Sequence, residues 1–165
     1  MGYDAVTELK ALKITEPEVA EIAKAREAGL SDQGCVEVAQ IYASRKQLFN
    51  AGDAIAGLLG AGASEDLILK LARLNQLGIG AGELEAMRLA GLSDDIVLAV
   101  AQHHADGQPE LSGASLASMK NLGMSAGTLL QLAERGVPDS RAAAIMNMRR
   151  RGAKDGQILR EFAGS

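Results

Sequence analysis

The chain has 165 residues, of which 47% are hydrophobic and 23% charged, and its formal net charge is −4. This length suits one globular domain, and the absence of any apolar run near the roughly 20 residues of a membrane span excludes a membrane-spanning segment. The chain has two Tyr, two Phe and no Trp, and its apolar positions are filled by Ala, Leu, Ile, Val and Met. Ala, Leu and Met are good helix formers, which favours an all-α fold.

The first predicted element is a short capping helix over residues 3–12. Val6, Leu9 and Leu12 fall on one face of this helix. A second helix is expected to begin after Thr15, because Thr15 and Glu18 have the spacing of a capping box. This helix opens the first of several similar units.

A motif centred on a glycine recurs along the chain, with successive glycines 33, 29, 32 and 29 residues apart. Apolar residues stand seven and four positions before each glycine, which predicts a short helix with one buried face. Further apolar residues stand six and seven positions after it and predict a second helix. The motif glycines are Gly29, Gly62, Gly91, Gly123 and Gly152.

The motif itself predicts a turn between two helices. The glycine ends the first helix, because the left-handed conformation is easily reached without a Cβ atom. Two positions later a serine is predicted to cap the second helix, at Ser31, Ser64, Ser93 and Ser125. In three units an acidic residue follows the serine, where its negative charge interacts favourably with the helix dipole. These residues are Asp32, Glu65 and Asp94.

The predicted architecture is therefore an all-α chain of tandem helical hairpins, with about five units of about 31 residues. The units lie near residues 15–47, 48–78, 79–109, 110–136 and 137–165. We expect them to stack as a compact α-solenoid, or alternatively as a closed bundle, within a single domain over residues 1–165. Lys154 replaces the capping serine in the last unit, as is usual for the end of a stacked array.

Basic residues recur three positions before the glycine, and they are candidate partner-binding residues. Two interpretations are open: a basic stripe that grips an acidic partner, or simple complements to the dipole at each helix end, which the pattern favours. Residues 111–165 carry eight basic and four acidic residues, against nine and seventeen in residues 1–110, so positive charge gathers towards the C-terminus. The candidate residues are Arg26, Arg88, Lys120, Arg149, Arg150 and Arg151.

Other polar features predict structure rather than chemistry. His103 and His104 are adjacent, and adjacent side chains on a helix diverge too far to chelate a metal well, so one is expected to be partly buried and the other exposed. Cys35 is expected to be a small buried hydrophobe. The glycine-rich segment 78–82 is interpreted as a joint between units, since no strand precedes it. We predict no catalytic residues, metal or cofactor, and hence no enzyme.

The leading functional hypothesis is a non-enzymatic interaction module that binds a protein or peptide. The alternative is nucleic-acid binding through the basic residues and the cluster Arg149–Arg151. The repeat length and the Gly-x-Ser placement resemble mitochondrial-terminator-type helical repeats, which bind nucleic acid. Most units lack the prolines of that family, so no site residue is carried over.

Two further expectations concern cellular context and assembly. The lone cysteine and the lack of a signal peptide predict a cytoplasmic protein that does not bind membranes. The N-terminal helix is half a hairpin, which predicts an apolar flank that a second copy could cover, so a homo-oligomer is possible.

Overall fold

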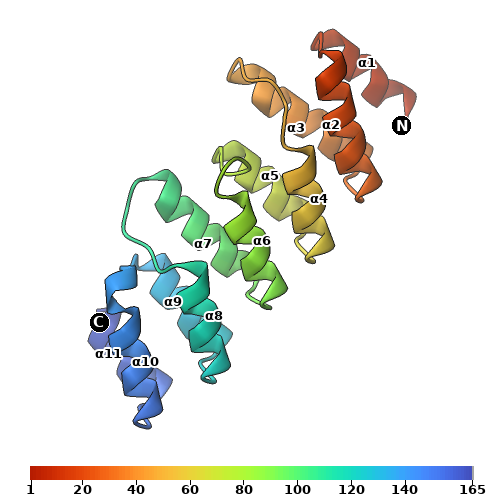
Figure 1. The fold of residues 1–165 in the computed structure, drawn as a ribbon. Helices are drawn as coiled ribbons and strands as arrows, with labels where there is room; N and C mark the ends of the chain where they lie inside the picture. Colours follow the sequence, from red (N-terminus) through yellow and green to blue (C-terminus); the bar gives the residue numbers. More distant parts are fainter. Residues whose placement is uncertain (165) are drawn as a thin grey trace. The chain divides into compact units, whose positions relative to one another are not determined.

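The computed structural model describes residues 1–164, and over this range the chain contains eleven α-helices, one 3-10 helix and no strand (Figure 1). The all-α prediction is therefore confirmed. Within the described chain, every helix falls short of the length and apolarity that a membrane crossing requires. The elements are α1 (Tyr3–Ala11), α2 (Glu16–Glu27), α3 (Asp32–Ser44), α4 (Gly52–Gly60), α5 (Glu65–Arg73), α6 (Ala81–Leu89), α7 (Asp94–Ala105), α8 (Gly113–Asn121), α9 (Ala126–Glu134), η1 (Asp139–Arg141), α10 (Ala142–Arg150) and α11 (Asp155–Phe162).

The helices follow the predicted order. The expected capping helix is α1, and each of the five predicted units contains two α-helices. The chain divides into two compact units, residues 1–85 and residues 86–165, and the division falls inside α6. A single domain over the whole chain stays a prediction, and the two units are described separately below.

In the N-terminal unit, helices pack on the next helix but one. The α2 helix packs against α4, and α3 packs against both α1 and α5, while α2–α3 and α4–α5 form antiparallel neighbours within hairpins (Figure 1). The core between these helices is aliphatic and includes Ile55, Leu58 and Ile68, all fully buried. Tyr42 and Phe49 add an edge-to-face aromatic pair with ring centroids 5.1 Å apart.

The C-terminal unit repeats this packing. The α9 helix packs against α7 and α11, and α8 packs against α10. Leu116, Met119, Leu132, Ile145 and Ile158 are fully buried between them. In both units, helices thus pack their apolar faces on the corresponding helix of the neighbouring hairpin, as α2 does on α4 and α9 on α11.

The turns between paired helices have the conformation that their sequence requires. The five motif glycines have φ angles between 84° and 116°, a region that side chains with a Cβ rarely adopt. At one such turn Leu92 N donates to Met87 O at 3.1 Å, which closes the C-terminal end of α6. At the start of α7, Ser93 Oγ accepts a hydrogen bond from Ile96 N at 3.3 Å.

The same serine cap occurs in three other units and is absent from the last. Ser31 Oγ accepts from Gly34 N at 2.9 Å, and Ser64 and Ser125 act in the same way. At the start of α11, Lys154 N instead donates to the side chain of Gln157 at 2.7 Å. In the last hairpin, the backbone N–H of Lys154 is therefore bonded by the side chain of Gln157 in the same helix.

Candidate functional site

The acidic residue that follows the capping serine joins one hairpin to the next. Glu65, at the start of α5, accepts hydrogen bonds from Ser31 N at 2.7 Å and from Ser31 Oγ at 2.9 Å. Asp32, at the start of α3, accepts one from Gly2 N at 2.7 Å, just before α1. Each carboxylate therefore accepts a hydrogen bond from a backbone N–H at the start of the corresponding helix one unit earlier. Within that helix this N–H has no acceptor. The sequence had indicated only a dipole interaction.

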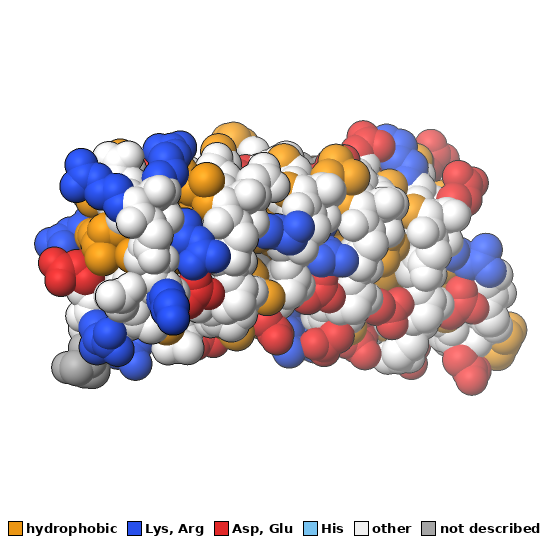
Figure 2. Space-filling view, turned by 90° about the horizontal axis from the view of Figure 1, so that it is seen from below, with side chains coloured by type: hydrophobic (Ala, Val, Ile, Leu, Met, Phe, Trp, Pro, Cys, Tyr) orange, Lys and Arg blue, Asp and Glu red, His pale blue; other side chains and the backbone are white. Residues whose placement is uncertain are grey.

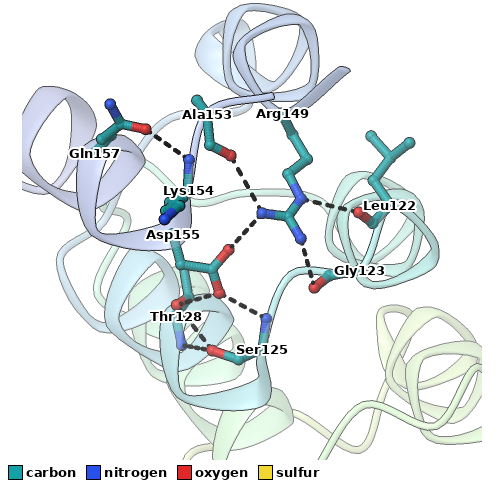
Figure 3. Close-up of polar contacts among 9 residues, drawn as sticks. All are labelled: Leu122, Gly123, Ser125, Thr128, Arg149, Ala153, Lys154, Asp155 and Gln157. Atoms are coloured by element: carbon teal, nitrogen blue, oxygen red, sulfur yellow. Dashed lines mark hydrogen bonds and ion pairs between the residues drawn. The ribbon is translucent and has the colours of Figure 1, made fainter. Parts of the chain in front are cut away.

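The most complete junction lies between the last two hairpins and is drawn in Figure 3. Asp155 Oδ2 accepts from Ser125 N at 3.0 Å and from Thr128 Oγ1 at 2.9 Å. Partial burial raises the pKa of Asp155, but these hydrogen bonds and the positive charge of Arg149 outweigh it and hold the pKa below its ordinary value. The carboxylate is therefore ionised at neutral pH, and its hydrogen bonds join the start of α11 to the start of α9.

Arg149, a predicted partner-binding residue, lies inside this junction. Its Nε donates to Leu122 O at 3.0 Å and its Nη2 to Gly123 O at 3.1 Å, at the C-terminal end of α8. Its Nη1 lies 3.2 Å from Ala153 O and 3.3 Å from Asp155 Oδ1 (Figure 3). The guanidinium thus completes the end of the preceding first helix and pairs with the aspartate of its own hairpin.

The other basic residues at this position also lie over helix ends. Arg26 Nε is 2.9 Å from Asp32 Oδ1, and Arg88 Nε is 3.1 Å from Asp94 Oδ1. The Lys120 ammonium lies 3.2 Å from the point where a Cβ atom on Gly91 would stand, beside the turn after α6. These contacts match the interpretation as complements to helix ends, and partner binding by Arg88, Lys120 and Arg149 stays an untested prediction.

Exposed basic side chains gather over the C-terminal hairpin. Figure 2 shows Lys and Arg side chains concentrated at the C-terminal end of the chain. Arg150 contacts Asn147 Oδ1 at 3.4 Å, and Arg141 lies over the Phe162 ring, 5.9 Å from its centroid. The exposed basic residues of α10, α11 and the turn between them are Arg150, Arg151, Lys154 and Arg160.

The two histidines near the end of α7 form hydrogen bonds to α9 and to the loop after α7. His103 is half-buried and its Nε2 lies 2.8 Å from Glu134 O, whereas His104 is exposed and its Nδ1 lies 2.9 Å from Glu110 Oε1. The predicted contrast in burial is therefore confirmed. Among residues 1–164 no three His, Cys, Asp or Glu side chains are grouped as a metal site would require.

Cys35 is fully buried in α3, and burial raises the pKa of its thiol to about 11. Because thiolates are the reactive form, we expect no reaction with Ellman's reagent at about pH 8 while the protein is folded, and one equivalent of reaction after denaturation in urea. Labelling of the folded protein at the denatured rate would contradict this burial.

An open groove of about 490 Å³ lies between α1 and α2. Leu9, Val19 and Ile22 line it with apolar side chains; Leu9 and Ile22 are buried, whereas Val19 is 51% exposed. The basic side chains of Lys10 and Lys13 also line the groove. The half-hairpin had predicted an apolar flank at this end of the chain, but no motif in the sequence identified these lining residues. The other lining residues are Met1, Val6, Ile14, Ala23, Arg26 and Glu27.

No protein-family model matches this chain, and no curated protein or solved structure is significantly similar to it. The functional interpretation therefore depends on the geometry described above.

Proposed function

We propose that this protein is a non-enzymatic interaction module that binds a protein or peptide in the groove between α1 and α2. The observation that carries the proposal is the exposed aliphatic surface of the groove, where Val19 and Met1 remain 51% and 39% exposed. Water is a poor solvent for such a surface, and a partner that covers it gains roughly 25 cal/mol for each Å² of apolar area buried. Most other polar motif positions are occupied by helix caps and by contacts between hairpins.

Site-specific photo-crosslinking tests this proposal. A benzophenone amino acid at Val19 lies in the groove, and the same probe at Leu48, which is 67% exposed in the same unit, serves as the control. We expect discrete protein adducts from cells of the source organism with the Val19 probe and not with the Leu48 probe. Identical adduct patterns at the two positions, or none at Val19, would contradict binding at the groove.

Nucleic-acid binding is the second candidate, favoured by the exposed basic side chains of the C-terminal hairpin. Arg150, Arg151, Lys154 and Arg160 are exposed, whereas Arg149 is held by four contacts within the protein. Phosphate contacts by exposed residues of this kind would make affinity fall steeply with salt concentration. This candidate involves a different surface from the groove, so the crosslinking result does not depend on it.

A further inference from the structure

The groove occupies the position of a helix that would precede α2 in the stack. First helices of neighbouring hairpins pack directly on each other, as α2 does on α4 and α8 does on α10. On α2, Glu21 and Lys24 face α4, where they reach Gly52 N at 2.8 Å and Asp53 Oδ2 at 3.2 Å. Val19 and Ala23, on the other side of α2, line the groove instead.

Arg26 occupies the position of Arg149, but within residues 1–164 no carbonyl of another first helix lies beside its Nη groups. Both residues stand three positions before the motif glycine and pair with the aspartate six positions later, Arg26 through Nε and Arg149 through Nη1. Arg149 additionally donates through Nε to Leu122 O and through Nη2 to Gly123 O, in the turn that ends the preceding first helix. Arg26 lines the groove, and within residues 1–164 its Nη1 and Nη2 groups make no hydrogen bond. These donors are therefore placed where the C-terminus of another helix would lie.

The charges around the groove indicate which kind of helix fits. Lys10 and Lys13 are exposed on the α1 side and form no ion pair among the described residues. The lining thus has three basic side chains, of which Arg26 is paired with Asp32, against the single acidic side chain of Glu27. Acidic side chains on the flanks of a bound helix would complement this surface.

We propose that the groove binds an amphipathic, acidic α-helix of a partner protein, which runs parallel to α2 and ends at Arg26. This inference rests on the proposed function and adds the conformation, charge and direction of the partner segment. The apolar face of the bound helix presents two large side chains three residues apart. The buried pairs Ile55 and Leu58 in α4, and Leu116 and Met119 in α8, have the same spacing. Arg26 donates to carbonyls in the turn that ends the bound helix, as Arg149 does to Leu122 and Gly123 after α8.

A pair of synthetic helices tests the charge of the partner. Each is a hydrocarbon-stapled peptide of about 15 residues, a length at which an unstapled helix is marginal in water. Both carry Leu at positions i, i+3 and i+7, and their flanking residues are Glu in one peptide and Lys in the other. Fluorescence anisotropy should show the Glu peptide binding at least about tenfold more tightly than the Lys peptide.

Variants of the protein locate the bound peptide. We expect Val19→Asp to abolish binding, Arg26→Ala to weaken the Glu peptide about fivefold, and the double change Lys10→Glu and Lys13→Glu to reverse the preference between peptides. Lys46→Glu, a charge reversal on an exposed residue outside the groove, is the matched control and should leave affinity unchanged. Circular dichroism of each variant checks that it is folded.

The direction of the helix is tested separately. A nitroxide at the C-terminus of the Glu peptide should broaden the amide resonances of residues 25–29, whereas a nitroxide at its N-terminus should broaden those of residues 15–19. The opposite pattern, or equal affinity for the two peptides, would overturn the inference. If crosslinking at Val19 nevertheless captures a protein, the proposed function stands and the inference fails; if it captures none, the proposed function itself fails.

Discussion

Replacing Glu18 with alanine is expected to lower the free energy of unfolding of the N-terminal unit by about 3 kcal/mol. The Glu18 side chain is buried and accepts hydrogen bonds from Phe49 N at 3.0 Å and from both Thr15 N and Thr15 Oγ1 at 3.1 Å. The substitution leaves the buried Phe49 N–H without a partner and removes the capping box of α2. Both losses act on the folded state, because water satisfies these groups in the unfolded chain.

Urea unfolding measured by tyrosine fluorescence provides the test. The chain has no Trp, and its two tyrosines, Tyr3 and Tyr42, both lie in the N-terminal unit, so the signal reports on that unit. The matched control is Glu16→Ala, which removes an exposed carboxylate from the same first turn and should cost no more than about 0.5 kcal/mol. Equal losses in the two variants would show that the bond to Phe49 contributes nothing.

The second large effect is expected at Asp155. Its replacement by alanine removes the acceptor for Ser125 N and Thr128 Oγ1 and leaves Arg149 without its ion pair, so we expect a loss of about 2–3 kcal/mol in the C-terminal unit. Hydrogen-exchange mass spectrometry should show faster exchange in α9 and α11. Asp95→Ala, at an exposed first-turn aspartate of α7, is the control and should leave exchange nearly unchanged.

The same carboxylate makes stability depend on pH. Because the pKa of Asp155 is lower in the folded state than in the unfolded chain, its contribution is complete above the unfolded value of about 4 and is lost as pH falls through the folded value. Asp139, whose pKa is lowered by hydrogen bonds from Ser115 and Ser112, acts in the same direction. Asp155→Asn should therefore reduce, without abolishing, the loss of stability of the C-terminal unit below about pH 4. An unchanged pH profile would contradict the assignment.

The sequence predicted local structure well because the decisive interactions there span only a few residues. The glycine φ angles, the serine caps and the pairing of Thr15 with Glu18 all depend on residues within a few positions of each other. The buried faces of the helices were predicted equally well, because the spacing of apolar residues along the sequence indicates which face of a helix packs against its neighbours. The all-α fold followed from these local signals.

Contacts between hairpins were not predictable in the same way. Glu65 meets Ser31, and Arg149 meets Leu122, only because neighbouring hairpins stack with a particular offset. One unit of sequence contains no information on that offset. The sequence therefore left two explanations of the basic residues open, a partner-binding stripe or the favoured complements to helix ends, and the structure is needed to place the side chains. The groove has no motif at all, because it is formed by the free sides of two helices.

Two glycines inside helices also depend on contacts that the sequence does not indicate. A Cβ atom on Gly57 in α4 would lie 2.3 Å from the Glu85 carboxylate. Gly52 is more constrained, because its Cβ would lie 2.4 Å from the backbone oxygen of Glu21, which cannot move without displacing α2. These helical glycines mark close approaches between neighbouring elements, which propensity within one helix does not reveal.

The two kinds of glycine leave different room for evolutionary change. The turn glycines Gly29, with φ of 116°, and Gly152, with φ of 94°, have open space around them and are constrained by backbone conformation, since these angles lie beyond the region near about 60° that asparagine adopts. Gly52 is constrained by space, so every side chain meets the same obstacle, however small or polar it is. A turn glycine can therefore be replaced if the turn relaxes locally towards φ of about 60°, where asparagine is tolerated, whereas Gly52 can be replaced only if α2 and α4 move apart.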